Sequence, residues 1–325
     1  MLGKVSPEDL SEHVFGRTGA QLASVLQGPA YGEDAAAIAV EDGTLVVSTD
    51  PISLAIDRVG TLGIHVACND VAASGGEPEW LTSVIFLHGG ADAERSLDRI
   101  TAQMDEAAAE LGIAIVGGHS EYNPSLERPL LTLTCMGMAD PFVPTGGAEP
   151  GDDVILTKGA AIEGTAILAS DFEAELLDRG VSPAVLEGAL EFYDEIGIIE
   201  EARVVRDYAT GMHDPTEGGL IDGLLELASA SGVTLTIDRS AIPVREETRA
   251  VCEAMDVDPL RIFGSGSLVA TVPSSETEAV IDGLDARDVE VAHIGHVRAT
   301  ESPSLELDGR TFTEPVRDDL YHLWE

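Results

Sequence analysis

The chain has 325 residues, and 18 Lys and Arg against 59 Asp and Glu give a formal net charge of −41 at pH 7. This charge excludes nucleic acids and anionic membranes as partners of the general surface, because both are also negative. The hydrophobic fraction of 44% excludes a disordered chain, so the carboxylates must coat an ordinary folded core.

The first part of the chain predicts a domain over residues 1–145. Ser6 and Pro7 favour the start of a short helix, and Asp42-Gly43 predicts the turn of a hairpin. Further elements are expected as strands at 31–40, 44–51, 80–87, 113–116 and 130–138, with 113–116 buried, and as helices at 62–74 and 92–111. Their order favours a mixed α+β sheet with helices on one face.

Turn-forming residues at 144–152 predict a boundary before a second domain over residues 151–300, an α/β sandwich. A strand, Gly159 and a helix follow the boundary, an order suited to binding anions at the helix N-terminus. Residues 212–219 are expected to form a polar loop, and 301–325 a tail. The remaining elements are expected as strands at 153–158, 234–237, 268–272 and 293–297, and as helices at 163–170, 172–208, 220–231, 246–255 and 275–284.

The helix at 62–74 carries a polar pair, Asn69-Asp70, in an otherwise apolar stretch. Small and apolar residues recur around it at three- and four-residue spacing, and Gly75-Gly76 ends it. A buried carboxylate without a partner costs roughly several kcal/mol, and a capping role is of little use at mid-helix. We therefore expect Asp70 to face a metal ion, an arginine or a set of N–H donors.

Five acidic residues interrupt or follow apolar runs next to small residues: Asp34, Asp50, Asp70, Glu121 and Asp214. Converging carboxylates repel one another unless cations neutralise them, and this many oxygen ligands is typical of Mg²⁺ shared with phosphates. The alternative is local hydrogen bonding, since Asp is common in turns at strand ends. The pattern favours a magnesium nucleotide site.

Glycine pairs support such a site at Gly117-Gly118 and Gly218-Gly219, where backbone N–H groups can approach an anion, although each pair also suits a tight turn. Lys158, one of two lysines, ends a strand before a glycine. Its ammonium is suited to phosphate, or it is an ordinary surface lysine. His213 is suited either to proton transfer or to orienting a neighbour by a hydrogen bond.

Cys68, Cys135 and Cys252 form no CxxC pair, which favours buried thiols over a disulfide framework or a zinc site. No secretion signal or membrane span is evident, so we expect a cytoplasmic protein. The acidity suggests a cytoplasm rich in salt, where a Debye length of roughly 3 Å at about 1 M screens the surface charges.

Five ordered motifs resemble the aminoimidazole ribonucleotide synthetase (AIR synthase, PurM-like) superfamily. The motifs are residues 32–36, Ser48-Thr49-Asp50, 68–78 from Cys68-Asn69-Asp70, 117–121 and 213–219. Within the superfamily the chain looks most like the hydrogenase maturation (HypE-like) branch and its AIR synthase-related archaeal relatives. The resemblance covers about residues 25 to 300.

The resemblance implies a two-domain homodimer in which the N-terminal sheets pair into a barrel and both subunits line an ATP groove. It implies Asp34, Asp50, Asp70 and Glu121 as magnesium ligands. It implies that Asn69 assists beside Asp70. We also predict nucleotide contacts from Thr49, Gly117, Gly118, Asp214, Gly218 and Gly219, and catalytic roles for Lys158 and His213. Glu33 stands where the family has a second aspartate, and we assign it no ligand role.

The implied function is a Mg²⁺- and ATP-dependent enzyme that phosphorylates an oxygen atom of an unidentified small-molecule or protein substrate. The HypE-like branch ends in a cysteine that carries the group to be dehydrated, whereas this sequence ends Tyr321-His322-Leu323-Trp324-Glu325. The alternatives are a nucleotide-binding or regulatory dimer without turnover, and ring closure of the AIR synthase type.

Overall fold

The computed structural model describes residues 3–53, 58–90 and 92–325. Strands with alternating buried and half-exposed residues build the first of its two sheets. The strand order is β1-β2-β3-β6-β4-β5, and only β4 and β5 pair in parallel. The strands are β1 (Val25–Gln27), β2 (Ala36–Val40), β3 (Gly43–Ile52), β4 (Gly76–His88), β5 (Ala114–Asn123) and β6 (Leu130–Ala139). The hairpin at Asp42-Gly43 and the short helix α1 (Pro7–Leu10), capped by Ser6, agree with the sequence.

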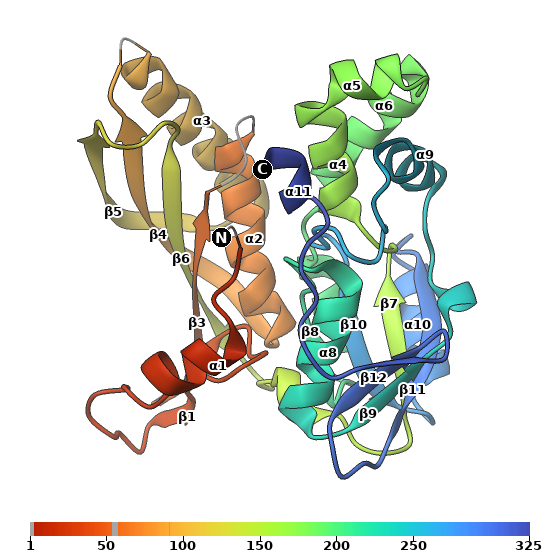
Figure 1. Ribbon diagram of the computed structural model, residues 1–325. Helices are drawn as coiled ribbons and strands as arrows, with labels where there is room; N and C mark the ends of the chain where they lie inside the picture. Colours follow the sequence, from red (N-terminus) through yellow and green to blue (C-terminus); the bar gives the residue numbers. More distant parts are fainter. Residues whose placement is uncertain (1–2, 54–57, 91) are drawn as a thin grey trace.

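Helices α2 (Val59–Ala73) and α3 (Ala93–Leu111) cover one face of this sheet (Figure 1). Among the described residues no helix covers the other face, whose side chains alternate with the buried ones along β3, β4 and β6. That open face carries Leu45, Val47, Thr49, Trp80, Thr82, Val84, Phe86, Thr132, Thr134, Met136 and Met138.

Helix α2 is buried on nearly every side, because it packs on the sheet and also on the second unit. The chain leaves it through Gly75, whose φ is +78° and whose Cβ would lie 2.5 Å from the Pro141 carbonyl oxygen, so only glycine fits there. Strand β4 begins immediately afterwards at Gly76 and includes Pro78.

The second sheet has the order β13-β12-β9-β11-β7-β10-β8, and helices pack around it (Figure 1). Its strands are β7 (Asp152–Thr157), β8 (Gly211–His213), β9 (Thr234–Ile237), β10 (Val269–Pro273), β11 (Val291–Arg298), β12 (Ser304–Leu307) and β13 (Arg310–Phe312). The helices are α4 (Ile162–Asp171), α5 (Glu173–Asp178), α6 (Pro183–Glu191), α7 (Ile199–Val205), α8 (Gly219–Ser231), α9 (Glu246–Met255), α10 (Thr277–Asp285) and α11 (Tyr321–Trp324).

Four expectations differ from the structure. The helix expected at 172–208 is divided into α5, α6 and α7, with a 3-10 turn at Phe192–Glu195. The strand at 113–116 is not buried, because it belongs to β5, an exposed strand at the sheet edge. The polar loop at 212–219 begins as a buried strand, β8. Residues 304–312, expected in a tail, add β12 and β13 to the second sheet, where β12 pairs in parallel with β9. The domain limits at 145, 151 and 300 stay predictions.

The three cysteines are free and buried, as expected. Cys68 and Cys135 pack together across α2 and β6, with 3.8 Å between their sulfur atoms. No helix in the described ranges is both long and apolar enough to cross a bilayer.

Candidate active site

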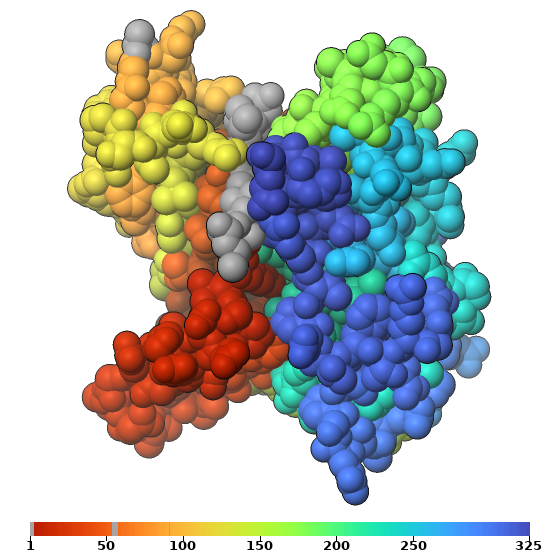
Figure 2. Space-filling model, in the orientation of Figure 1, coloured from red at the N-terminus to blue at the C-terminus, as the bar shows by residue number. Residues whose placement is uncertain are grey.

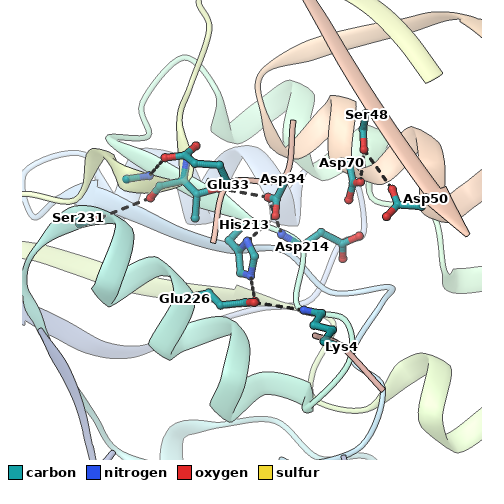
Figure 3. Close-up of polar contacts among 12 residues, drawn as sticks. Lys4, Glu33, Asp34, Ser48, Asp50, Asp70, His213, Asp214, Glu226 and Ser231 are labelled. Carbon is teal, nitrogen blue, oxygen red and sulfur yellow. Dashed lines mark hydrogen bonds and ion pairs between the residues drawn. The ribbon is translucent and has the colours of Figure 1, made fainter. Parts of the chain in front are cut away.

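Buried carboxylates from both units gather where α2 and the first sheet meet β8 (Figure 3). Asp34 precedes β2, Asp50 lies on β3 and Asp70 on α2. His213 ends β8, and Asp214 follows it. The structure therefore brings together four of the five acidic residues that the sequence singled out.

Ser48 links two of these carboxylates. Its hydroxyl lies 2.5 Å from Asp70 Oδ2 and 3.1 Å from Asp50 Oδ2, and a hydroxyl has only one proton to donate. Burial, and then the neighbouring carboxylates of Asp50, Asp34 and Asp214, raise the pKa of Asp70 well above its usual range. A cation among these groups would relieve that repulsion.

The sequence analysis selected Thr49 instead of Ser48, and the structure contradicts a place for Thr49 in this group. Successive strand residues point to opposite faces, so Ser48 and Asp50 face α2 while Thr49 faces the open side of the sheet. There its hydroxyl lies 2.9 Å from that of Thr134. The spacing of two between Ser48 and Asp50 was the signal that could have identified Ser48.

Asp214 is the least satisfied member of the group. Its side chain is about 1% exposed, and neither carboxylate oxygen makes a hydrogen bond within the described residues. Burial and the nearby charge of Asp34 raise the pKa of Asp214 well above its usual range, although His213 opposes the rise. A buried carboxylate without a partner is the environment expected at a cation site.

The donor set fits Mg²⁺ that arrives with phosphate oxygens. In the parts of the chain that the structure describes, no three acidic, His or Cys side chains form a ready-made cage for one ion. Mg²⁺ is commonly held by one or two carboxylates together with waters and substrate phosphates, so it needs no such cage. Asp34, Asp50, Asp70 and Asp214 supply oxygen atoms of this kind.

His213 is held between two carboxylates. Its Nδ1 lies 2.7 Å from Asp34 Oδ1 and its Nε2 lies 3.1 Å from Glu226 Oε2, while Lys4 Nζ lies 3.2 Å from Glu226 Oε1. Burial alone would lower the pKa of His213, but Asp34 and Glu226 outweigh it and raise the pKa to about 10. The imidazolium is therefore charged at neutral pH, which favours the orienting role over proton abstraction.

Lys158 is not placed to bind phosphate. Its Nζ donates to the carbonyl oxygens of Glu195 at 2.8 Å and Gly197 at 2.6 Å, and lies 2.6 Å from Glu201 Oε1. Two donors of the ammonium group are thus used by carbonyl oxygens, and its charge is paired with Glu201 inside the protein. Lys158 therefore ties the 195–197 segment to the end of β7.

Asn69 also acts inside the protein. Its side-chain amide donates to the Ile196 carbonyl at 2.8 Å and accepts from the Ile198 N–H at 3.0 Å. Asn69 is fully buried and joins α2 to the second unit through these two hydrogen bonds.

The Gly218-Gly219 pair begins α8 with φ values of +81° and +66°. The Gly218 N–H donates to Asp318 Oδ2 at 2.9 Å, and the Gly219 N–H donates to the Thr216 carbonyl at 3.1 Å. Both N–H groups are therefore occupied, and the glycines serve the turn instead of forming an open anion cradle.

Gly117, Gly118 and Glu121 lie elsewhere, on β5. Three strand steps separate β5 from β3, which is roughly 14 Å at 4.8 Å a step. The Glu121 side chain is half-exposed beside His119. Within one chain these residues cannot join the group around Asp70.

The comparisons with known proteins agree with this architecture. Residues 32–139 match the N-terminal domain, and residues 149–308 the C-terminal domain, of the family described as AIR synthase related protein. The chain belongs to the AIR synthase-related family. It is 31% identical over 331 residues to the carbamoyl dehydratase HypE of Cupriavidus necator, a match that covers 94% of this chain and 88% of that protein.

Solved structures show the same fold. HypE in a HypE-HypF complex has a TM-score of 0.76 at 22% identity, covering 94% of this chain and 99% of that one. A hydrogenase maturation protein HypE in complex with ATP has a TM-score of 0.67 at 24% identity, covering 98% and 96%. The predicted two-domain PurM-like fold is confirmed, and the prediction of a dehydratase-like, ATP-dependent enzyme is confirmed at the level of this AIR synthase-related family.

Proposed function

We propose that this chain is a Mg²⁺- and ATP-dependent enzyme that phosphorylates an oxygen atom of its substrate, as a HypE-like dehydratase would. The unsatisfied buried carboxylate of Asp214, beside Asp34, Asp50 and Asp70, carries the proposal. A relative named as carbamoyl dehydratase and a related fold that binds ATP support it.

The residues divide into two roles. Asp34, Asp50, Asp70 and Asp214 would hold Mg²⁺ together with the phosphates, and the ion would supply positive charge to balance the transferred phosphoryl group. His213 keeps Asp34 in place through its charged imidazolium. Once ATP has phosphorylated the oxygen and ADP has left, that oxygen can depart as inorganic phosphate with loss of a proton from nitrogen, so that a carbamoyl-type group undergoes net dehydration.

A homodimer would complete the site. The open face of the first sheet is rich in apolar and threonine side chains, and no described helix covers it. Such a face is suited to pairing with a second copy. We propose that β5, with Gly117, Gly118 and Glu121, reaches the nucleotide of the partner copy from there.

We propose that the enzyme works in a salt-rich cytoplasm, where dissolved ions screen its net charge of −41. A HypE-HypF complex is known among the structural relatives, so we propose a protein as the source of the substrate group.

Calorimetric ATP binding in molar KCl, with and without Mg²⁺, tests the site. We expect Mg²⁺-dependent binding that Asp70→Asn or Asp214→Asn weakens by about 100-fold, the effect of losing a charged ligand. Asp152→Asn is the matched control, because Asp152 is buried but bonds Thr210 and the Glu149 N–H outside the site. Equal binding by all the variants would refute the assignment.

A further inference from the structure

A cavity of about 620 Å³ lies behind the candidate active site, between the N-terminal segment and the stretch 313–318. Figure 2 shows these two segments, red and blue, lying against each other on one face of the molecule. Glu226 forms the common wall: one carboxylate oxygen lies 3.1 Å from His213 and the other 3.2 Å from Lys4.

The lining of this cavity is strongly acidic. Glu217, Asp222, Glu226 and Asp318 all line it. Burial, and to a smaller extent neighbouring carboxylates, raises the pKa of both Asp222 and Asp318 to about 7. Of the cations there, Arg317 pairs with Glu325 outside the cavity.

Lys4 already places an ammonium group in this cavity. Its Nζ contacts Glu226, and its backbone N–H donates to Glu217 Oε2 at 3.0 Å. The side chain nevertheless stays about 44% exposed, so it is held at its tip and can leave without breaking a packed core.

Two phenol groups point to a ligand independently of the charges. The Tyr321 side chain is about 2% exposed and lines the cavity, and its hydroxyl makes no hydrogen bond with any described residue, although Glu217 is close to it. The buried Tyr31 hydroxyl is also unpartnered and faces the charges of Glu226 and Asp222. Unsatisfied buried hydroxyls are uncommon and call for a partner.

We propose that this cavity binds the ammonium or guanidinium group of a small organic molecule, and that Lys4 occupies the position of that group while the ligand is absent. The volume suits a small molecule and far exceeds that of a single cation. The cationic end of this molecule lies on Glu226, whose other carboxylate oxygen contacts His213 of the candidate active site.

Binding of n-butylammonium, measured by calorimetry in molar KCl, tests the cavity directly. We expect Lys4→Ala to bind the amine about tenfold more tightly than the wild type or Lys4→Arg, the effect of one freed charge-assisted hydrogen bond. Adding Asp222→Asn to Lys4→Ala should remove that gain. n-Butanol, which lacks the charge, should not bind, and thermal melts verify that every variant is folded.

Equal amine binding by the wild type and Lys4→Ala, or equal binding of n-butanol, would overturn the inference. ATP binding in the same samples separates the two proposals. Retained Mg²⁺-dependent ATP binding without amine binding refutes the cavity alone. Amine binding without ATP binding refutes the proposed function and leaves the cavity as a cation site.

Discussion

At the scale of single residues, the contacts of Lys158 indicate that it stabilises the fold and does not bind phosphate. It neutralises Glu201, whose side chain is about 3% exposed. Lys158→Met should lower the free energy of unfolding by about 3 kcal/mol, because it leaves a buried charge unpaired. Urea denaturation in molar KCl measures this.

The double variant Lys158→Met/Glu201→Gln is the control for that prediction. It removes both charges and should regain most of the lost stability. If Lys158→Met instead stays fully stable and loses only ATP turnover, the structural reading of Lys158 is wrong.

Glu163 predicts a pH dependence of stability. Burial, and then the Glu217 carboxylate, raise the pKa of Glu163 to about 7. The folded protein thus binds this proton more tightly than the unfolded chain, so the contribution of Glu163 to stability falls as pH rises from about 4 to 7 and is constant above that. Glu163→Gln should be more stable than the wild type by about 2 to 3 kcal/mol at pH 8 and nearly equal at pH 4.

Denaturant unfolding of both proteins across this range checks the difference. A stability difference that is the same at pH 4 and pH 8 would show that Glu163 does not titrate in this way.

The sequence could identify the acidic residues of the candidate site because each interrupts an apolar pattern. It could also have chosen Ser48 over Thr49, since Ser48 lies two residues from Asp50 and therefore on the same face of β3, but it could not show that the Ser48 hydroxyl contacts Asp70 on α2. It also could not show that Lys158 and Asn69 bind the 195–198 segment, because those partners lie more than a hundred residues away from Asn69 and about forty from Lys158.

At the scale of elements, the open face of the first sheet predicts a dimer. Val84 lies on this face, at the centre of β4. Val84→Asp should convert a wild-type species of twice 34.0 kDa into a 34.0 kDa monomer, because it places a charge in an apolar interface. Light scattering after gel filtration in molar KCl measures both masses.

Leu177→Asp is the matched control for the dimer. Leu177 is an exposed leucine on α5, about 41% exposed, in the other unit. It should leave the mass unchanged. A wild-type monomer, or a Val84→Asp dimer, would contradict the proposed pairing.

Long periodic elements were predictable from the sequence. Helix α9 and strand β9 have the expected bounds, and α8 ends at Gly232 as expected. The predictions failed for short strands and for the exposure of a strand, which depends on its neighbours in the sheet. The apolar run at the start of β5 looks buried in sequence, yet it is exposed because no strand pairs with its outer edge in the described chain.

At the scale of the whole molecule, a net charge of −41 predicts dependence on salt. In dilute buffer the carboxylates repel one another over roughly 30 Å at 0.01 M, against roughly 3 Å at 1 M. We expect the melting temperature to fall and the fold to loosen as KCl is lowered from molar to dilute. Circular dichroism and thermal melts that do not change with KCl would refute this.

The neighbouring residues Asn69 and Asp70 connect α2 to both units of the molecule. Asn69 makes hydrogen bonds to the backbone of Ile196 and Ile198 in the second unit, while Asp70 accepts one from Ser48 on the first sheet. Moving the units apart would exchange these hydrogen bonds for hydrogen bonds to water, at a cost of about 0.5 to 1.5 kcal/mol for each. Two neighbouring residues of α2 therefore connect the carboxylate cluster directly to the 196–198 segment of the second unit.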